Sequence, residues 1–195
     1  MMRGTGMTVV AVLALLFSHG CLYEPRTAEQ PGQGDADKWI VPNAPKDVFR
    51  NLTSGFVSRN NSNYDRSLDP TFIFIGRPED IANLPPGALD GWTKSVELDF
   101  LTRLKGDYSV QRTIQFGDEN GTFEKESIEV GRAVFEGSYV MTLDAGEGFD
   151  VETYAGIARF VVINGTQGWV LTSWEDLDIY GNYSTGGYLR GRLRS

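Results

Sequence analysis

The side chains best suited to acid–base and nucleophilic chemistry are scarce in this sequence. Its one histidine, His19, and its one cysteine, Cys21, both lie near the N-terminus. A domain formed by the residues after them therefore has no Ser-His-Asp triad, no Cys-His pair, no internal disulfide and no zinc site built on histidine or cysteine. A tyrosine paired with a carboxylate remains chemically possible, because a buried carboxylate can act as a base while a tyrosine hydroxyl supports an oxyanion. The spacing identifies no catalytic residue, and we expect neither a metal nor a cofactor.

Arginine and aromatic side chains on the expected strands and helices are the candidates for ligand binding: Trp92, Tyr108, Arg112, Tyr139, Arg159 and Trp169. Arg112 and Arg159 each share a strand face with apolar residues, so each either lines a pocket or pairs with an acid at a sheet edge. Tyr139 either points into a pocket or lies in the core with its hydroxyl hydrogen-bonded. Trp92 and Trp169 either fill the core or stack on a ligand.

The chain is acidic, with 26 Asp and Glu against 18 Lys and Arg and a formal net charge of −8. This balance argues against a nucleic-acid partner, because phosphates require a basic surface. Most carboxylates of such a chain must face solvent. We expect this of Glu97, Asp99, Asp176 and Asp178.

The N-terminal segment is typical of a secretory signal. Arg3 precedes an uncharged apolar run at residues 7–17, which is shorter than the roughly 20 residues that span a membrane. Gly20 then precedes Cys21, an arrangement that resembles a bacterial lipobox, although Ser18 and His19 stand where a leucine and a small residue are usual. The resemblance implies cleavage before Cys21, its lipidation, and a membrane as partner through that lipid. The alternative is an ordinary signal peptide with an unmodified cysteine.

Four segments follow from this interpretation. They are a lipoprotein signal peptide at residues 1–20, a lipidated cysteine with a flexible tether at 21–38, an α+β domain at 39–180 and a mobile tail at 181–195. Leu22, rather than aspartate, follows the cysteine. By resemblance to the sorting rule of Gram-negative lipoproteins, this implies the outer membrane of the cell envelope.

Helices are expected first and strands later. Apolar residues recur at helical spacing from residue 43 or 44 to residue 57, a short helix is expected at 64–68, a strand at 71–75 and a helix at 91–105. From residue 108 onward the pattern alternates as in strands, and residues 164–167 predict a hairpin turn. This order indicates an α+β fold.

The order of elements resembles that of the NTF2-like (SnoaL-like) superfamily. The features that carry the resemblance are residues 64–70 after the first helix, a helix that begins with Trp92, and a final strand at 169–176. The resemblance covers residues 43–180. It implies a cone-shaped NTF2-like (cystatin-like) fold, in which N-terminal helices pack on a curved, mainly antiparallel sheet.

Fold does not decide function. Three hypotheses remain open for a bacterial lipoprotein of this fold. It is a non-catalytic binding or accessory module for an unknown small molecule or protein, a small-molecule isomerase, cyclase or hydratase using Tyr and carboxylate groups, or an adaptor that forms a homodimer through its open sheet face.

Overall fold

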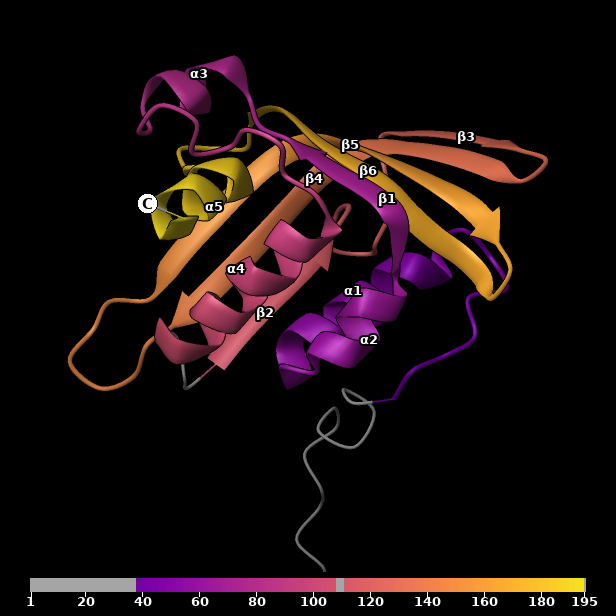
Figure 1. The fold of residues 1–195 in the computed structure, drawn as a ribbon, viewed down its shortest axis with the longest axis horizontal. Helices are drawn as coiled ribbons and strands as arrows, with labels where there is room; N and C mark the ends of the chain where they lie inside the picture. The colour runs from indigo at the N-terminus through magenta and orange to yellow at the C-terminus, as the bar shows by residue number, and fades with distance from the viewer. Residues whose placement is uncertain (1–37, 108–110, 195) are drawn as a thin grey trace, which may run out of the picture. The chain divides into compact units, whose positions relative to one another are not determined.

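The computed structural model describes residues 38–107 and 111–194, and most of its helices lie before most of its strands in the chain (Figure 1). All of these residues belong to one folding unit, residues 32–195. The first half contains α1 (Asp47–Ser58), α2 (Asn61–Arg66), β1 (Leu68–Ile75), α3 (Pro78–Ala82) and α4 (Lys94–Asp107). The second half contains β2 (Gln111–Phe116), β3 (Lys125–Glu129), β4 (Arg132–Asp144), β5 (Glu152–Gly165), β6 (Gly168–Ile179) and α5 (Gly186–Arg194). The predicted signal peptide, Cys21, nearly all of the tether and Tyr108 lie outside the described residues.

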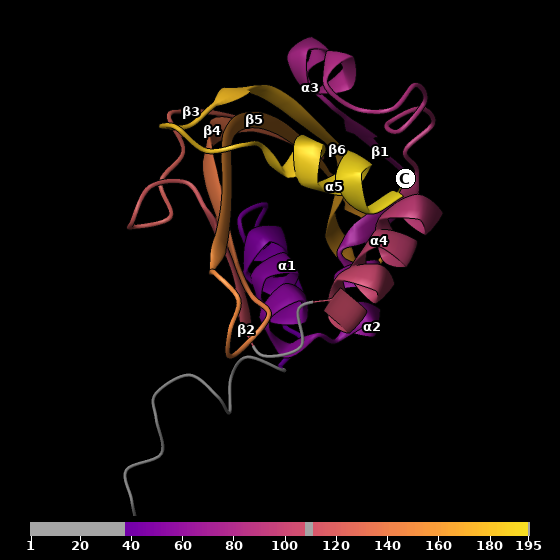
Figure 2. The same ribbon diagram turned by 90° about the vertical axis from the view of Figure 1, so that its left-hand side faces the viewer.

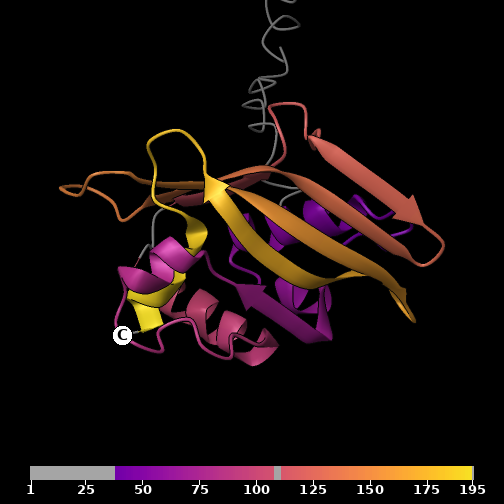
Figure 3. The same ribbon diagram turned by 90° about the horizontal axis from the view of Figure 1, so that it is seen from above.

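The described strands form one mixed sheet in the order β1-β6-β5-β4-β2, and β3 also pairs with β4. Only β1 and β6 run parallel, so the sheet is mainly antiparallel, as predicted. The sheet bends around α1, and α4 lies on the opposite side of α1 from β4 (Figure 2). β3 lies at the sheet edge beside the first residues of β4 (Figure 3).

The apolar stripe of α1 explains why this segment is a helix and how it packs. Val48, Phe49, Leu52 and Phe56 recur every three or four residues and are all buried against the sheet. The following turn depends on Gly55, because a Cβ there would lie 2.7 Å from the backbone nitrogen of Tyr64. This close approach brings α2 against α1 and directs Tyr64 into the interior.

Aromatic rings fill the space between α1 and the sheet. Phe49 contacts Phe116, Phe123, Phe135 and Phe160, with ring centroids 4.7 to 5.3 Å apart. Trp174 extends this cluster from β6, 5.1 Å from the Phe160 ring. The interior near α1 is therefore packed with side chains.

The C-terminal segment corrects the sequence prediction. Residues 181–195 were expected to form a mobile tail because they contain few apolar side chains, but residues 186–194 form α5, which packs on α3, α4 and β5. Leu189 and Arg190 of this helix are buried at 0% and 1% exposure. Leu189 is its one fully buried large apolar side chain, while Tyr188 and Leu193 are only partly buried, so its hydrophobic pattern was too weak to predict it.

Candidate functional site

Glu97 lies at the centre of a buried polar network in the first turn of α4, and its side chain is 0% exposed. Its Oε1 accepts hydrogen bonds from the Tyr64 hydroxyl at 3.2 Å and from Arg190 Nη2 at 2.7 Å. Its Oε2 accepts from Trp92 Nε1 at 2.7 Å and from Arg190 Nε at 2.9 Å. Both carboxylate oxygens therefore have two donors each, and the carboxylate links α2, α4 and α5.

Arg190 reaches this carboxylate from α5 through a channel of aromatic rings. Its guanidinium carbon lies 4.3 Å from the ring centroid of Phe74, 4.4 Å from that of Trp174 and 5.2 Å from that of Phe100. Burial alone would lower the pKa of the guanidinium, but the adjacent Glu97 carboxylate outweighs that effect and raises it. Arg190 is therefore held as a cation in the interior, packed between these rings and the Glu97 carboxylate.

A tyrosine–carboxylate pair lies beside this network. Asp176 Oδ1 accepts a hydrogen bond from Trp174 Nε1 at 2.9 Å, and the Tyr139 hydroxyl also bonds to Asp176. Burial raises the pKa of Asp176 to about 6, and the charge of Arg190 and the hydrogen bonds oppose this rise. By chemistry alone, this pair fits the Tyr/carboxylate mechanism that the sequence left open.

The start of α5 covers this pair. The backbone nitrogen of Gly187 donates to Asp176 Oδ2 at 2.9 Å, and that of Gly186 donates to the Tyr139 hydroxyl at 2.7 Å. The fit is close, because a Cβ at Gly187 would lie 2.9 Å from Asp176 Oδ2. No substrate can reach the two side chains while α5 is in place.

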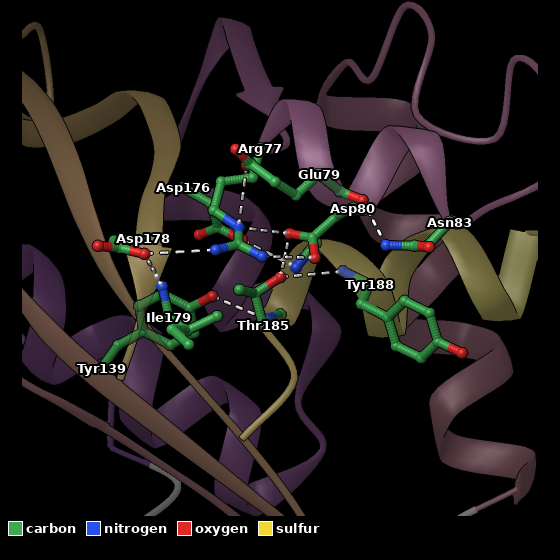
Figure 4. Close-up of polar contacts among 12 residues, drawn as sticks. Arg77, Glu79, Asp80, Asn83, Tyr139, Asp176, Asp178, Ile179, Thr185 and Tyr188 are labelled. Atoms are coloured by element: carbon green, nitrogen blue, oxygen red, sulfur yellow. Dashed lines mark hydrogen bonds and ion pairs between the residues drawn. The ribbon is translucent and has the colours of Figure 1, made fainter. Parts of the chain in front are cut away.

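Ion pairs fix the segment that leads into α5 (Figure 4). Arg77, which precedes α3, binds Asp80 through two nitrogens at 3.3 Å and Asp178 at 3.3 Å. The Thr185 hydroxyl donates to Asp80 Oδ2 at 2.6 Å and accepts from the Tyr188 backbone nitrogen at 3.2 Å, which caps the helix. The contacts join α5 to α3 and to the end of β6.

An open groove of about 740 Å³ lies on the other side of α1, between that helix, β2 and the turn before β3. Its apolar lining residues are Phe49, Val57, Ile114, Phe116 and Phe123. Its polar and basic lining residues are Lys46, Arg50, Thr53, Ser54, Gln115, Asn120 and Gly121. Among the described residues, no carboxylate lines it. We call this the α1–β2 groove.

Arg112 lies on the apolar face of β2, as predicted, and is 1% exposed. Its Nε donates to the backbone oxygen of Phe56, and its guanidinium carbon lies 4.9 Å from the Phe56 ring centroid. Its Nη1 and Nη2 have no hydrogen-bond partner among the described residues. Burial, followed by the charge of Arg59, lowers the pKa of Arg112 to about 10. It does not line the α1–β2 groove.

Arg159 shares a strand face with Ile157, Val161 and Ile163, as predicted, but this is the outer face of β5, because Ala158, Phe160 and Val162 face the core. Arg159 does not line a pocket: it is exposed and pairs with Glu175 at 3.1 Å and Glu136 at 3.5 Å, which is the acid-pairing alternative.

The structure places the three remaining candidates that it describes, Trp92, Tyr139 and Trp169, in the core. Tyr139 is 0% exposed, Trp92 2% and Trp169 8%, as expected if they fill the core. Among the acids, Asp99 and Asp178 are exposed as predicted, whereas the prediction for Glu97 and Asp176 is wrong. The alternation and spacing did not show this, because each carboxylate is accommodated in part by a group from α5 that is distant in sequence or unpredicted: Arg190 for Glu97 and the Gly187 backbone nitrogen for Asp176.

The described residues have the NTF2-like fold, an α+β arrangement with helices and a mixed sheet of six strands. An NTF2-like superfamily protein from Salmonella enterica is 13% identical, with a TM-score of 0.50 over 73% of this chain and 94% of that protein. A protein from Kribbella flavida is 17% identical, with a TM-score of 0.52 over 74% of this chain and 92% of that protein. A conserved protein from Planctomyces limnophilus is 14% identical, with a TM-score of 0.51 over 68% and 91%. No protein-family model and no curated protein sequence matches the chain.

Among the described residues, no cluster of His, Cys, Asp and Glu could hold a metal ion. No helix in this part of the chain is both long and apolar enough to cross a membrane.

Proposed function

We propose that this protein is an exported, lipid-anchored envelope protein whose NTF2-like domain is a non-catalytic binding module, and that the α1–β2 groove is its ligand site. The main support for this proposal is the groove itself. Its volume of about 740 Å³ is in the range of small-molecule sites, it is open to solvent, and its floor is apolar. In the part of the chain that the structure describes, no carboxylate lines it, so this lining offers a ligand contact surface without a carboxylate as general acid or base.

The interior supports a non-catalytic role. Glu97 has both oxygens occupied, and Asp176 and Tyr139 are covered by the backbone of α5. Catalysis by a tyrosine and a carboxylate would require α5 to leave, which would separate Arg190 from Glu97 and leave a buried charge unpaired.

The isomerase, cyclase or hydratase hypothesis is the second candidate. One observation favours it: the pKa of about 6 brings Asp176 close to the range of a general base, next to a tyrosine hydroxyl. The groove and the covered pair together favour binding over catalysis.

A neutral, polarity-sensitive dye such as Nile red tests the groove. We expect the full-length protein to bind it with a rise in fluorescence. Thr53→Trp, which fills the groove from α1, should abolish the signal, whereas the matched control Thr102→Trp at an exposed position of α4 should keep it. Equal binding by both variants, or none by the unmodified protein, would rule the groove out.

The anchor rests on the leader sequence, and Cys21 is its attachment point. An acyl chain contributes about 0.8 kcal/mol for each buried CH₂. We expect palmitate labelling and outer-membrane fractionation to be lost in Cys21→Ser. If the label and the membrane fraction persist in that variant, the protein is not anchored through this residue.

A further inference from the structure

The lining of the α1–β2 groove is divided into an apolar part and a cationic end. Lys46 directly precedes α1 and Arg50 lies on its first turn, and both line the groove. Val57, near the other end of the helix, also lines it, as does Ile114 of β2. The two ends are separated by about 16 Å along the helix, at 1.5 Å per residue. A ligand that fills the groove therefore meets cations at one end, and beyond them a mainly apolar lining that also contains the neutral polar side chains of Thr53, Ser54 and Gln115.

A second cavity extends the cationic end. This cavity, of about 260 Å³, is lined by Lys38, Ile40 and Asn51, and shares Arg50 and Ser54 with the groove. Lys38, Lys46 and Arg50 thus lie at one end of a groove that no carboxylate of the described residues lines. Acids lie beside these cations, among them Glu126 and Asp47, but the side chains that face the groove at this end are cationic and can attract an anion.

The ion pairs that Lys46 and Arg50 form within the protein are solvent-exposed. Lys46 pairs with Glu126 at 2.5 Å, but the Lys46 side chain is 46% exposed and that of Glu126 is 27% exposed. Arg50 is 73% exposed and lies 3.6 Å from Asp47. Exposed pairs of this kind contribute little to stability, so an incoming anionic group can compete for both cations.

We propose that the groove binds a single-chain anionic amphiphile, a free fatty-acid carboxylate, with its headgroup at Lys46 and Arg50 and its chain directed towards Val57. This inference deepens and rests on the proposed function of the groove. One unbranched chain suits an elongated site walled by α1 and β2, and the volume is that of a small-molecule site. The carboxylate supplies the charge that the cationic end complements.

Calorimetric titration of the full-length protein with laurate and with the neutral dodecanol tests the ligand class, at concentrations below micelle formation. We expect laurate to bind about tenfold more tightly, which is the gain expected from two exposed ion pairs. Lys46→Gln combined with Arg50→Gln should remove this difference and leave dodecanol binding unchanged. The matched control, Lys125→Gln with Arg159→Gln, removes two exposed cations of the sheet and should retain the preference.

The outcomes separate the two proposals. Equal affinities for laurate and dodecanol, unchanged in Lys46→Gln/Arg50→Gln but lost in Thr53→Trp, would overturn the assignment of an anionic ligand and keep the groove as a binding site. Absence of binding by either compound would overturn both proposals. Laurate binding that survives in Thr53→Trp would place the carboxylate outside the groove and overturn the inference.

Discussion

Replacing Arg190 by methionine tests whether one buried ion pair holds α5 on the domain. Methionine keeps an apolar chain of similar length against Phe74 and Trp174 but removes the two hydrogen bonds to Glu97 at 2.7 and 2.9 Å. Glu97, which is 0% exposed, then keeps only the Tyr64 and Trp92 donors. Removing one partner of a buried pair costs about 3–5 kcal/mol. Because domains of this kind are stable by about 5–15 kcal/mol, we expect a large loss of stability.

A second variant separates the pair from the packing around it. Glu97→Gln in the Arg190→Met background removes the unpaired charge, and the glutamine oxygen can still accept from Trp92 or Tyr64. The double variant should therefore be more stable than Arg190→Met alone. We expect a coupling energy of about 2 kcal/mol or more in the double-mutant cycle, since directly bonded residues are not additive.

Urea unfolding followed by tryptophan fluorescence measures these differences, because Trp92 and Trp174 both contact the network. The control is Arg192→Met, which removes an exposed arginine paired with Glu152 from the same helix and should cost less than about 1 kcal/mol. If Arg190→Met costs no more than Arg192→Met, or if the double variant is the less stable of the two, the ion pair does not hold α5.

Three further variants probe single features of the interior. Burial raises the pKa of Asp176 from 3.8 to about 6, so the stability that the protonated carboxyl contributes is complete below about pH 4 and is lost as the pH rises through 6. The free energy of unfolding, compared with that of Asp176→Asn, should therefore fall by about 3 kcal/mol from pH 4 to pH 7. A difference between the two proteins that stays constant with pH would contradict the raised pKa. Arg112→Leu removes a buried charge that lacks partners at Nη1 and Nη2, so the urea midpoint should rise by the equivalent of about 1 kcal/mol or more, and a marked fall would show that the charge is compensated. Gly187→Ala places a Cβ 2.9 Å from the Asp176 carboxylate and should lower the free energy of unfolding by about 1–3 kcal/mol. The control is Gly106→Ala on α4, whose Cβ meets no atom within 4 Å and should not destabilise the protein. Thermal melts of both variants measure the difference. If the two variants lose the same stability, the close contact at Gly187 is excluded as the cause.

The sequence predicted those parts of the fold that local patterns encode. The spacing of Val48, Phe49 and Leu52 predicted α1, and the alternation around Arg112 placed that arginine on the buried face of β2. For Arg159 the alternation identified its neighbours on the strand but not which face is buried, because both faces of β5 carry apolar residues and the face of Ala158, Phe160 and Val162 is the one against the core.

The buried network could not be predicted, because its members are distant in sequence and individually ordinary. Glu97 and Arg190 are 93 residues apart, and each is a residue type that usually faces solvent. The α1–β2 groove also escaped prediction. Its apolar residues belong to the same stripe and strand that form the core, so only the packing shows which of them remain accessible.

The position of α5 in the chain has a consequence for biosynthesis. Helix α5 follows every strand and helix that it holds together, so these elements leave the ribosome before Arg190 is available to pair with Glu97. Until then, Glu97 has no countercharge, and the interior cannot close over it without burying a lone anion. A product interrupted before α5 should remain open and sensitive to proteases, which would allow incomplete chains to be removed while finished ones persist. The helix thus makes completion of the domain depend on a segment synthesised after all the elements that it joins.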